Sequence, residues 1–225
     1  GKLFTFSGQN AELSKEGQLL SFDRTQGEFQ VIDLSSAKLL KRIKLELDGP
    51  NGISSPVFSS MLFQNQLLIS TAKSLVVLDS LGTKSKEIFY SDLVDRFNLQ
   101  NKSISVLIRS NWDKKTGDVY LWIKDFNSHQ NQFKSYDQAI HFLKFNPISN
   151  QGEVIELKVP EALIQDGLGY YSALPPHVAV DNETLVYTFS YLPEIFVFDT
   201  KTKTSQQFEI PLHNYAQAEP IPYSK

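Results

Sequence analysis

The chain repeats one phrase four times: a short apolar run ending in Asp or Asn, a polar turn, and then an alternating strand. The apolar runs end at Asp33, Asp79, Asn146 and Asp199. Short alternating segments joined by small polar turn residues are typical of β-hairpins, and Asp suits a turn because its carboxylate accepts hydrogen bonds from nearby backbone N–H groups. The repetition restricts the chain to folds built from copies of one β-unit.

Each hairpin follows two further strand-like runs, so each repeat offers four strands in the order A, B, C, D. The predicted strands cover 3–7, 19–23, 29–33 and 39–47; 56–61, 66–70, 75–79 and 87–90; 103–109, 119–124, 140–146 and 153–159; and 177–181, 184–191, 195–199 and 207–210. Four antiparallel strands with short connections form the meander of a propeller blade. Two helices are also predicted, over 91–99 with Ser91 as N-cap and over 160–165 with Pro160 in the first turn.

The predicted fold is all-β: a β-propeller of four-stranded antiparallel blades, with about four blades visible. The ends of the apolar runs are 46, 67 and 53 residues apart (33 to 79, 79 to 146, 146 to 199), close to the roughly 40 to 50 residues of propeller repeats. A β-sandwich of equal strand count predicts less self-similarity. We expect one domain over 1–225, with blades at 1–48, 49–91, 92–160 and 161–211, and 212–225 connecting to a further blade.

Composition and charge exclude several classes of function. The formal net charge of -3, with no dense run of Lys or Arg, gives no electrostatic attraction to nucleic acid. No apolar run approaches the roughly 20 residues that cross a bilayer. Zero cysteines exclude disulfides, thiol catalysis and thiolate metal sites. We expect a monomer that needs no cofactor.

Four segments together carry a resemblance to a known family: Arg24–Leu34, Leu47–Ile53, His177–Tyr187 and Ile195–Asp199. They resemble a family of uncharacterised six-bladed β-propeller lipoproteins of Gram-negative bacteria, catalogued as a domain of unknown function. The resemblance implies a ring of six blades, an N-terminal lipid anchor in the full protein, and a location in the periplasm or at the outer membrane. It brings no activity and no catalytic residues with it.

The residues offer little recognisable chemistry. His129, His141, His177 and His213 lack the spacing of zinc ligands, so no metal site is predicted. The segment 113–118 has lysines at its second and third positions, which favours a β-turn over a calcium loop. Acids in the D-to-A loops could form a glycosidase pair only if two lay about 5 to 9.5 Å apart, which a sequence does not measure.

The candidate binding residues lie mainly in the D-to-A connections, which share one face of a propeller with the B-to-C loops. The segment 166–176 carries two adjacent tyrosines on a Gly- and Pro-rich loop, a platform suited to a sugar ring or a peptide. The alternative is that one tyrosine packs beneath the loop and the other is merely exposed. The candidate residues are Asp48, Asn51, Arg96, Asp166, Tyr170, Tyr171 and His177.

Three hypotheses about function remain open. The first is a non-catalytic, extracytoplasmic binding or scaffold propeller that recognises a protein or glycan through its D-to-A and B-to-C loops. The second is a carbohydrate-active hydrolase or lyase with its site at the central channel. The third is a structural part of an envelope assembly that uses an exposed strand edge. The absence of a catalytic motif favours binding over catalysis.

Overall fold

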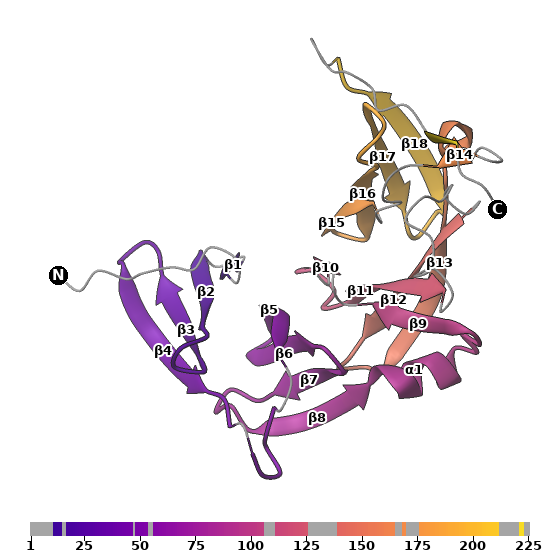
Figure 1. Cartoon of the computed structure of the whole chain (residues 1–225). Coiled ribbons are helices and arrows are strands. Elements are labelled where there is room, and N and C mark those ends of the chain that lie inside the picture. The colour runs from indigo at the N-terminus through magenta and orange to yellow at the C-terminus, as the bar shows by residue number, and fades with distance from the viewer. Residues whose placement is uncertain are drawn as a thin grey trace.

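The computed structural model describes residues 11–14, 17–46, 48–53, 56–105, 111–125, 139–164, 168–169, 176–211 and 221–222. Its main sheets are antiparallel meanders that follow one another along an arc, from the N-terminal blade to the C-terminal blade (Figure 1). Each of these main sheets uses strands that are consecutive in the sequence. The chain is an all-β propeller with four visible blades, as the repeat predicted.

The bounds of the strands follow the repeat. Blade 1 contains β1 (Ala11–Leu13), β2 (Gln18–Asp23), β3 (Glu28–Asp33) and β4 (Lys38–Lys44); blade 2 contains β5 (Val57–Phe63), β6 (Gln66–Thr71), β7 (Ser74–Leu78) and β8 (Lys84–Phe89). Blade 3 contains β9 (Lys102–Ser105), β10 (Asn111–Trp112), β11 (Val119–Asp125), β12 (Ala139–Asn146) and β13 (Gln151–Lys158); blade 4 contains β15 (His177–Asp181), β16 (Thr184–Thr188), β17 (Glu194–Asp199) and β18 (Thr204–Glu209). Both β9 and β10 pair with β11, so together they take the place of strand A. A small separate sheet pairs β14 (Leu168–Gly169) with β19 (Ile221–Pro222).

The blades present their first strands to the inner side of the arc. β1, β5, β10 and β15 lie there, while β4 and β8 lie on the outer side (Figure 1). Because neighbouring strands are antiparallel, the A-to-B and C-to-D turns of every blade lie at one rim, and the B-to-C and D-to-A connections lie at the other. We call these the A–B rim and the D–A rim.

The hydrophobic core lies between blades. One cluster joins blades 1 and 2 and includes Phe29 and Leu67, a second joins blades 2 and 3 through Leu75 and Leu143, and a third joins blades 3 and 4 through Phe142. The alternation of the strands explains this arrangement, because successive side chains of a strand point to opposite faces of its sheet. Each blade therefore depends on its neighbours for burial.

The turns confirm the role predicted for the aspartates that end strand C. Asp33 accepts a hydrogen bond from the backbone N–H of Ser35, Asp79 from those of Leu81 and Thr83, and Asp199 from those of Lys201 and Thr202. These hydrogen bonds hold the pKa of all three carboxyl groups below its usual range; at Asp33 the largest contribution comes from the Ser36 hydroxyl. The repeated Asp is thus a turn residue.

The two predicted helices differ from the structure at their ends. α1 runs over Tyr90–Arg96 and has Phe89 as its N-cap with no side-chain hydrogen bond, so Ser91 lies inside the helix and is not the cap. The helix can begin without a side-chain cap because Tyr90 is buried in the core between blades 2 and 3. The second is a single 3₁₀ turn, η2 (Glu161–Leu163), directly after Pro160.

Strand ends differ for a related reason. β8 begins at Lys84 and β18 at Thr204, each three residues before its predicted start at 87 or 207. Polar residues join these outer strands because backbone pairing to strand C does not require burial. The predicted strand at 3–7 and residues 106–109 of the strand predicted at 103–109 lie outside the described residues.

Candidate functional site

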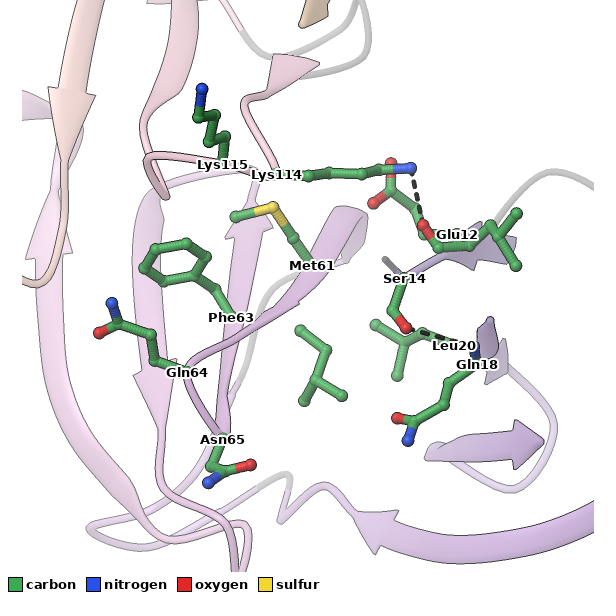
Figure 2. A pocket seen from close by; sticks show the side chains of 12 residues that line it. Glu12, Ser14, Gln18, Leu20, Met61, Phe63, Gln64, Asn65, Lys114 and Lys115 are labelled. Atoms are coloured by element: carbon green, nitrogen blue, oxygen red, sulfur yellow. Dashed lines mark hydrogen bonds between the residues drawn. The ribbon is translucent and has the colours of Figure 1, made fainter. Parts of the chain in front are cut away.

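A cavity of about 420 Å³ opens at the A–B rim, where blades 1, 2 and 3 meet (Figure 2). This volume falls in the range of small-molecule sites, about 300 to 1,000 Å³. The lining comes from the first turns of three blades and the strands beside them: Glu12, Leu13, Ser14, Gln18 and Leu20; Met61, Leu62, Phe63, Gln64 and Asn65; and Lys114 and Lys115. We call it the channel-mouth pocket, because β1, β5 and β10 are inner strands.

Glu12 is the carboxylate of the channel-mouth pocket. It lies on β1, and its Oε2 atom is buried with no hydrogen-bond partner among the residues that the structure describes. Burial raises the pKa of Glu12, and the ammonium of Lys114 opposes that rise. A buried oxygen without a donor is costly, so a donor group placed next to Glu12 would be stabilising.

Backbone and side-chain hydrogen bonds order the blade 1 wall. The Lys114 ammonium donates to the carbonyl oxygen of Leu13 at 2.8 Å, which links blade 3 to blade 1 (Figure 2). The backbone N–H of Gln18 donates to the Ser14 hydroxyl at 3.2 Å. Lys114 therefore fixes the end of β1 beside Glu12.

The opposite wall is apolar. Met61 and Phe63 lie two residues apart on β5, and both side chains point into the pocket (Figure 2). Leu20 of β2 lies on the other side, beside its register partner Glu12, and it and Met61 are each 2% exposed. The turn after β5 consists of Gln64 and Asn65, both with positive φ (48° and 62°), and places two amide side chains at the edge.

Asp113 fixes the turn that carries Lys114 and Lys115. Its side chain is fully buried, at 0% exposure, and its Oδ1 accepts hydrogen bonds from the backbone N–H groups of Lys115 (2.8 Å) and Thr116 (3.3 Å). Its Oδ2 accepts one from the backbone N–H of Glu183 in blade 4, at 2.6 Å. One carboxylate thus orders a pocket loop and joins two blades.

An ion cluster lies next to this joint. The Lys144 ammonium is 3.6 Å from Asp118 Oδ2 and 3.4 Å from Glu183 Oε1, and Lys201 is 2.6 Å from Glu183 Oε2. The hydrogen bond from Lys201, followed by the charge of Lys144, lowers the pKa of Glu183. Because each carboxylate has a lysine partner, we assign this cluster to joining blades 3 and 4.

The channel-mouth pocket offers hydrogen bonding more readily than catalysis. Among its described lining residues Glu12 is the one acid, whereas glycoside hydrolysis ordinarily needs two carboxyl groups about 5 to 9.5 Å apart. Across the part of the chain that the structure describes, no three His, Asp or Glu side chains come together as a metal site would require.

The residues predicted from sequence lie elsewhere. Asp48 is exposed and Asn51 half-buried in the connection from β4 to β5, and His177 is exposed at the start of β15, with Nε2 3.4 Å from the Ser190 hydroxyl. Arg96, at the end of α1, donates to the carbonyl oxygen of Asn150 at 2.7 Å and lies over the ring of Phe97. In the described part of the chain, no hydrogen bond or ion pair joins any two of these four.

Asp166, Tyr170 and Tyr171 lie outside the described residues, so the tyrosine platform remains a prediction. His177 lies at the opposite end of β15 from the turn that contacts Asp113. The predicted D–A rim and the channel-mouth pocket are therefore two different faces of the propeller.

Sequence reasoning missed the pocket because its residues are ordinary ones brought together from three blades. The signal that was available is Glu12 itself, an acid between Ala11 and Leu13 on an inner strand, together with the Gln64-Asn65 turn. Neither identifies a site without the neighbouring blades.

In the described residues no helix is long and apolar enough to cross a membrane.

The fold and the interblade pocket define the chain as a β-propeller. Residues 7–224 match the family model described as Domain of unknown function (DUF4221), and the chain belongs to this family. No curated protein matches it.

Solved structures agree on the fold. A DUF4221 family member from Bacteroides vulgatus has a TM-score of 0.62 at 15% identity, over 97% of this chain and 64% of that one. This chain thus spans less than two thirds of that relative. Weaker similarities include hydrazine synthase of Kuenenia stuttgartiensis (TM-score 0.47, 11% identity, 85% of this chain and 64% of that one) and virginiamycin B lyase from Staphylococcus aureus (0.45, 14%, 92% and 71%). The match to the Bacteroides structure shows the fold and carries no function.

Proposed function

We propose that this propeller is a non-catalytic binding module, and that the channel-mouth pocket is its ligand site. The observation that carries the proposal is Glu12, whose buried Oε2 has no donor among the described residues of a pocket that three blades build together. Ordered turns hold the pocket: Lys114 is bonded to Leu13, and Asp113 fixes the loop behind it. A preorganised site of this kind lowers the cost of binding.

The predicted partners, a protein or a glycan, stay part of this proposal, and so does a monomeric state. The D–A rim is the second place where such a partner could bind, through Asp48, Asn51, His177 and segment 166–171. The single acid in the pocket supports binding over a hydrolase or lyase reaction there.

A screen on glycan and peptide arrays tests the proposal. We expect the chain to retain at least one probe class, to lose it when Gln64→Ala and Asn65→Gly are combined, and to keep it when Tyr170→Ala and Tyr171→Ala are combined. Loss in the tyrosine variant alone would move the site to the D–A rim. New reducing ends on array glycans, found by mass spectrometry, would show an enzyme instead.

An exposed apolar face supports a second role, as part of a larger ring. On the blade 4 face turned away from blade 3, Val186 is 38% exposed and Phe208 is 51% exposed, and they lie opposite Val197 and Ile195 in the sheet register. A further blade would bury these side chains as blades 1 to 4 bury each other's. We propose a ring of six blades. The Bacteroides relative supports a larger ring, because the match covers only 64% of its chain.

The proposed setting is the cell envelope of a Gram-negative bacterium, with the full protein held by an N-terminal lipid in the periplasm or at the outer membrane. Cell fractionation of the full-length protein tests this. Recovery with the membrane fraction and release by lipase treatment is the expected result, and recovery in the cytosol would contradict it.

A further inference from the structure

We infer that the channel-mouth pocket takes a neutral saccharide of one or two rings; this inference rests on the proposed binding function. The polar lining combines a carboxyl group (Glu12), a hydroxyl (Ser14) and three amides (Gln18, Gln64 and Asn65). Carboxylates accept hydrogen bonds, and amides both donate and accept them. Sugar hydroxyls also do both, so a polyol can donate hydrogen bonds to this lining and accept hydrogen bonds from it.

The apolar wall matches the other surface of a sugar. Met61 and Phe63 of β5 lie across the pocket from Glu12 (Figure 2), while Leu20 lies beside Glu12 as its register partner on β2. Ligand sites typically pair such an apolar wall with a few placed polar groups that orient the ligand. A sugar ring presents C–H groups on its face and hydroxyls at its edge, and this pocket offers partners for both kinds of contact.

The charges of the pocket favour a neutral ligand. The ammonium of Lys114 acts on Glu12 electrostatically and is already hydrogen-bonded to Leu13. Lys115 points away from Glu12 (Figure 2). A cationic ligand would lie beside the ammonium of Lys114, and an anionic ligand would lie beside the carboxylate of Glu12, so each would meet a like charge. A hydroxyl can donate to Glu12 Oε2 without this repulsion.

The competing ligand is a zwitterion such as a short peptide. Its ammonium and carboxylate would need separate, opposite charges in the site. Here Glu12 and Lys114 already act on each other and Lys114 donates to Leu13, so a zwitterion would have to compete with these contacts for both charges.

Saturation-transfer NMR on the purified chain tests the inference with named probes. The neutral probes are galactose, N-acetylglucosamine and lactose; glucuronate, glucosamine and the dipeptide Gly-Phe are the charged ones. We expect transfer to at least one neutral sugar and weaker transfer to the charged probes.

Two pocket variants and one matched control locate the binding. Glu12→Gln keeps the shape but replaces a charged acceptor, and we expect about tenfold weaker binding. Asn65→Gly removes an amide at a position whose positive φ suits glycine, and we expect about threefold weaker binding with the fold unchanged. Glu46→Gln, an exposed residue after β4, serves as control and should not alter binding.

Each contrary outcome has a distinct meaning. If no neutral sugar binds, or if both pocket variants bind as well as the wild type, the saccharide inference is wrong. If Gly-Phe binds in a manner that depends on Glu12, the saccharide inference fails while the binding function stands. If no probe binds, the saccharide inference fails, and the array screen alone decides the binding function.

Discussion

Asp113 shows at the scale of one residue how this propeller joins its blades. The side chain is buried, and its two oxygens serve three backbone N–H groups, two in its own turn and one from Glu183 in blade 4. A carboxylate suits this position because it only accepts hydrogen bonds and has several lone pairs. The sequence indicated the turn at 113–118 but not the bond to blade 4, because Glu183 is 70 residues away.

Replacing Asp113 by Asn tests this joint. The amide can accept on one side only, so its NH₂ would face a backbone donor; we expect a loss of about 1 to 3 kcal/mol in the free energy of unfolding. Urea denaturation measures it. Asp23→Asn is the control: Oδ1 of Asp23 alone accepts from Thr25 and Gln26 in an exposed turn, so the change should stay within about 0.5 kcal/mol. Equal losses at both sites would contradict the account.

The raised pKa of Glu12 predicts how the stability of the fold depends on pH. Burial raises its pKa in the folded state, so folding disfavours the charged form. This penalty is absent below the pKa of the unfolded state, about 4.3, and reaches its full size above the folded pKa. Glu12→Gln should therefore be more stable than the wild type at pH 7, and the gain should vanish as the pH falls through this range.

Thermal unfolding at pH 7 and at acidic pH measures this difference. A variant that is less stable than the wild type at pH 7 would mean that Lys114 outweighs burial and that the folded pKa is lowered. Lys114 would then already stabilise the ionised carboxylate of Glu12, and a ligand donor would gain little there.

At the scale of elements, neighbouring turns pack against each other to shape the pocket. Gly117 follows Asp113 in the turn after β10 and has a φ of 78°; a Cβ atom there would lie 2.7 Å from Phe63 Cε1 of β5. Glycine is needed both for the left-handed conformation and for the approach of the ring. The apolar wall of the pocket is therefore held from the side of blade 3.

Gly117→Ala tests this contact between turns. We expect a loss of about 2 to 4 kcal/mol from backbone strain plus overpacking against Phe63. Gly27→Ala is the matched control, because its φ is also positive (61°) but its Cβ would meet open space, and it should cost about 1 kcal/mol. Denaturation curves compare the two, and similar losses would show that Phe63 is not held by this glycine.

The sequence was most informative about the positions of the strands. Strands B and C of every blade were predicted within two or three residues, because their alternation reflects burial against a neighbouring blade. Outer strands and α1 were less well bounded, since β8 and β18 begin with polar residues and α1 begins without a side-chain cap. Local pattern does not determine where backbone pairing stops.

At the scale of the whole molecule, the hydrophobic cores shared by neighbouring blades produce both the fold and the candidate site. Blades bury their faces against each other along the arc, which brings β1, β5 and β10 to its inner side (Figure 1). The channel-mouth pocket follows from that arrangement and could not be predicted, because Glu12, Phe63 and Lys114 meet only once three blades are stacked. The predicted D–A rim residues belong to the opposite face.

The most direct measurement is amide chemical-shift mapping of the chain during titration with galactose, N-acetylglucosamine and lactose. The account predicts that shift changes concentrate at Glu12, Asn65 and Lys114, with little change at Arg96 and His177. Changes concentrated at His177 and over 166–171, or no change with any of these sugars, would contradict the assignment of the channel-mouth pocket as a saccharide site.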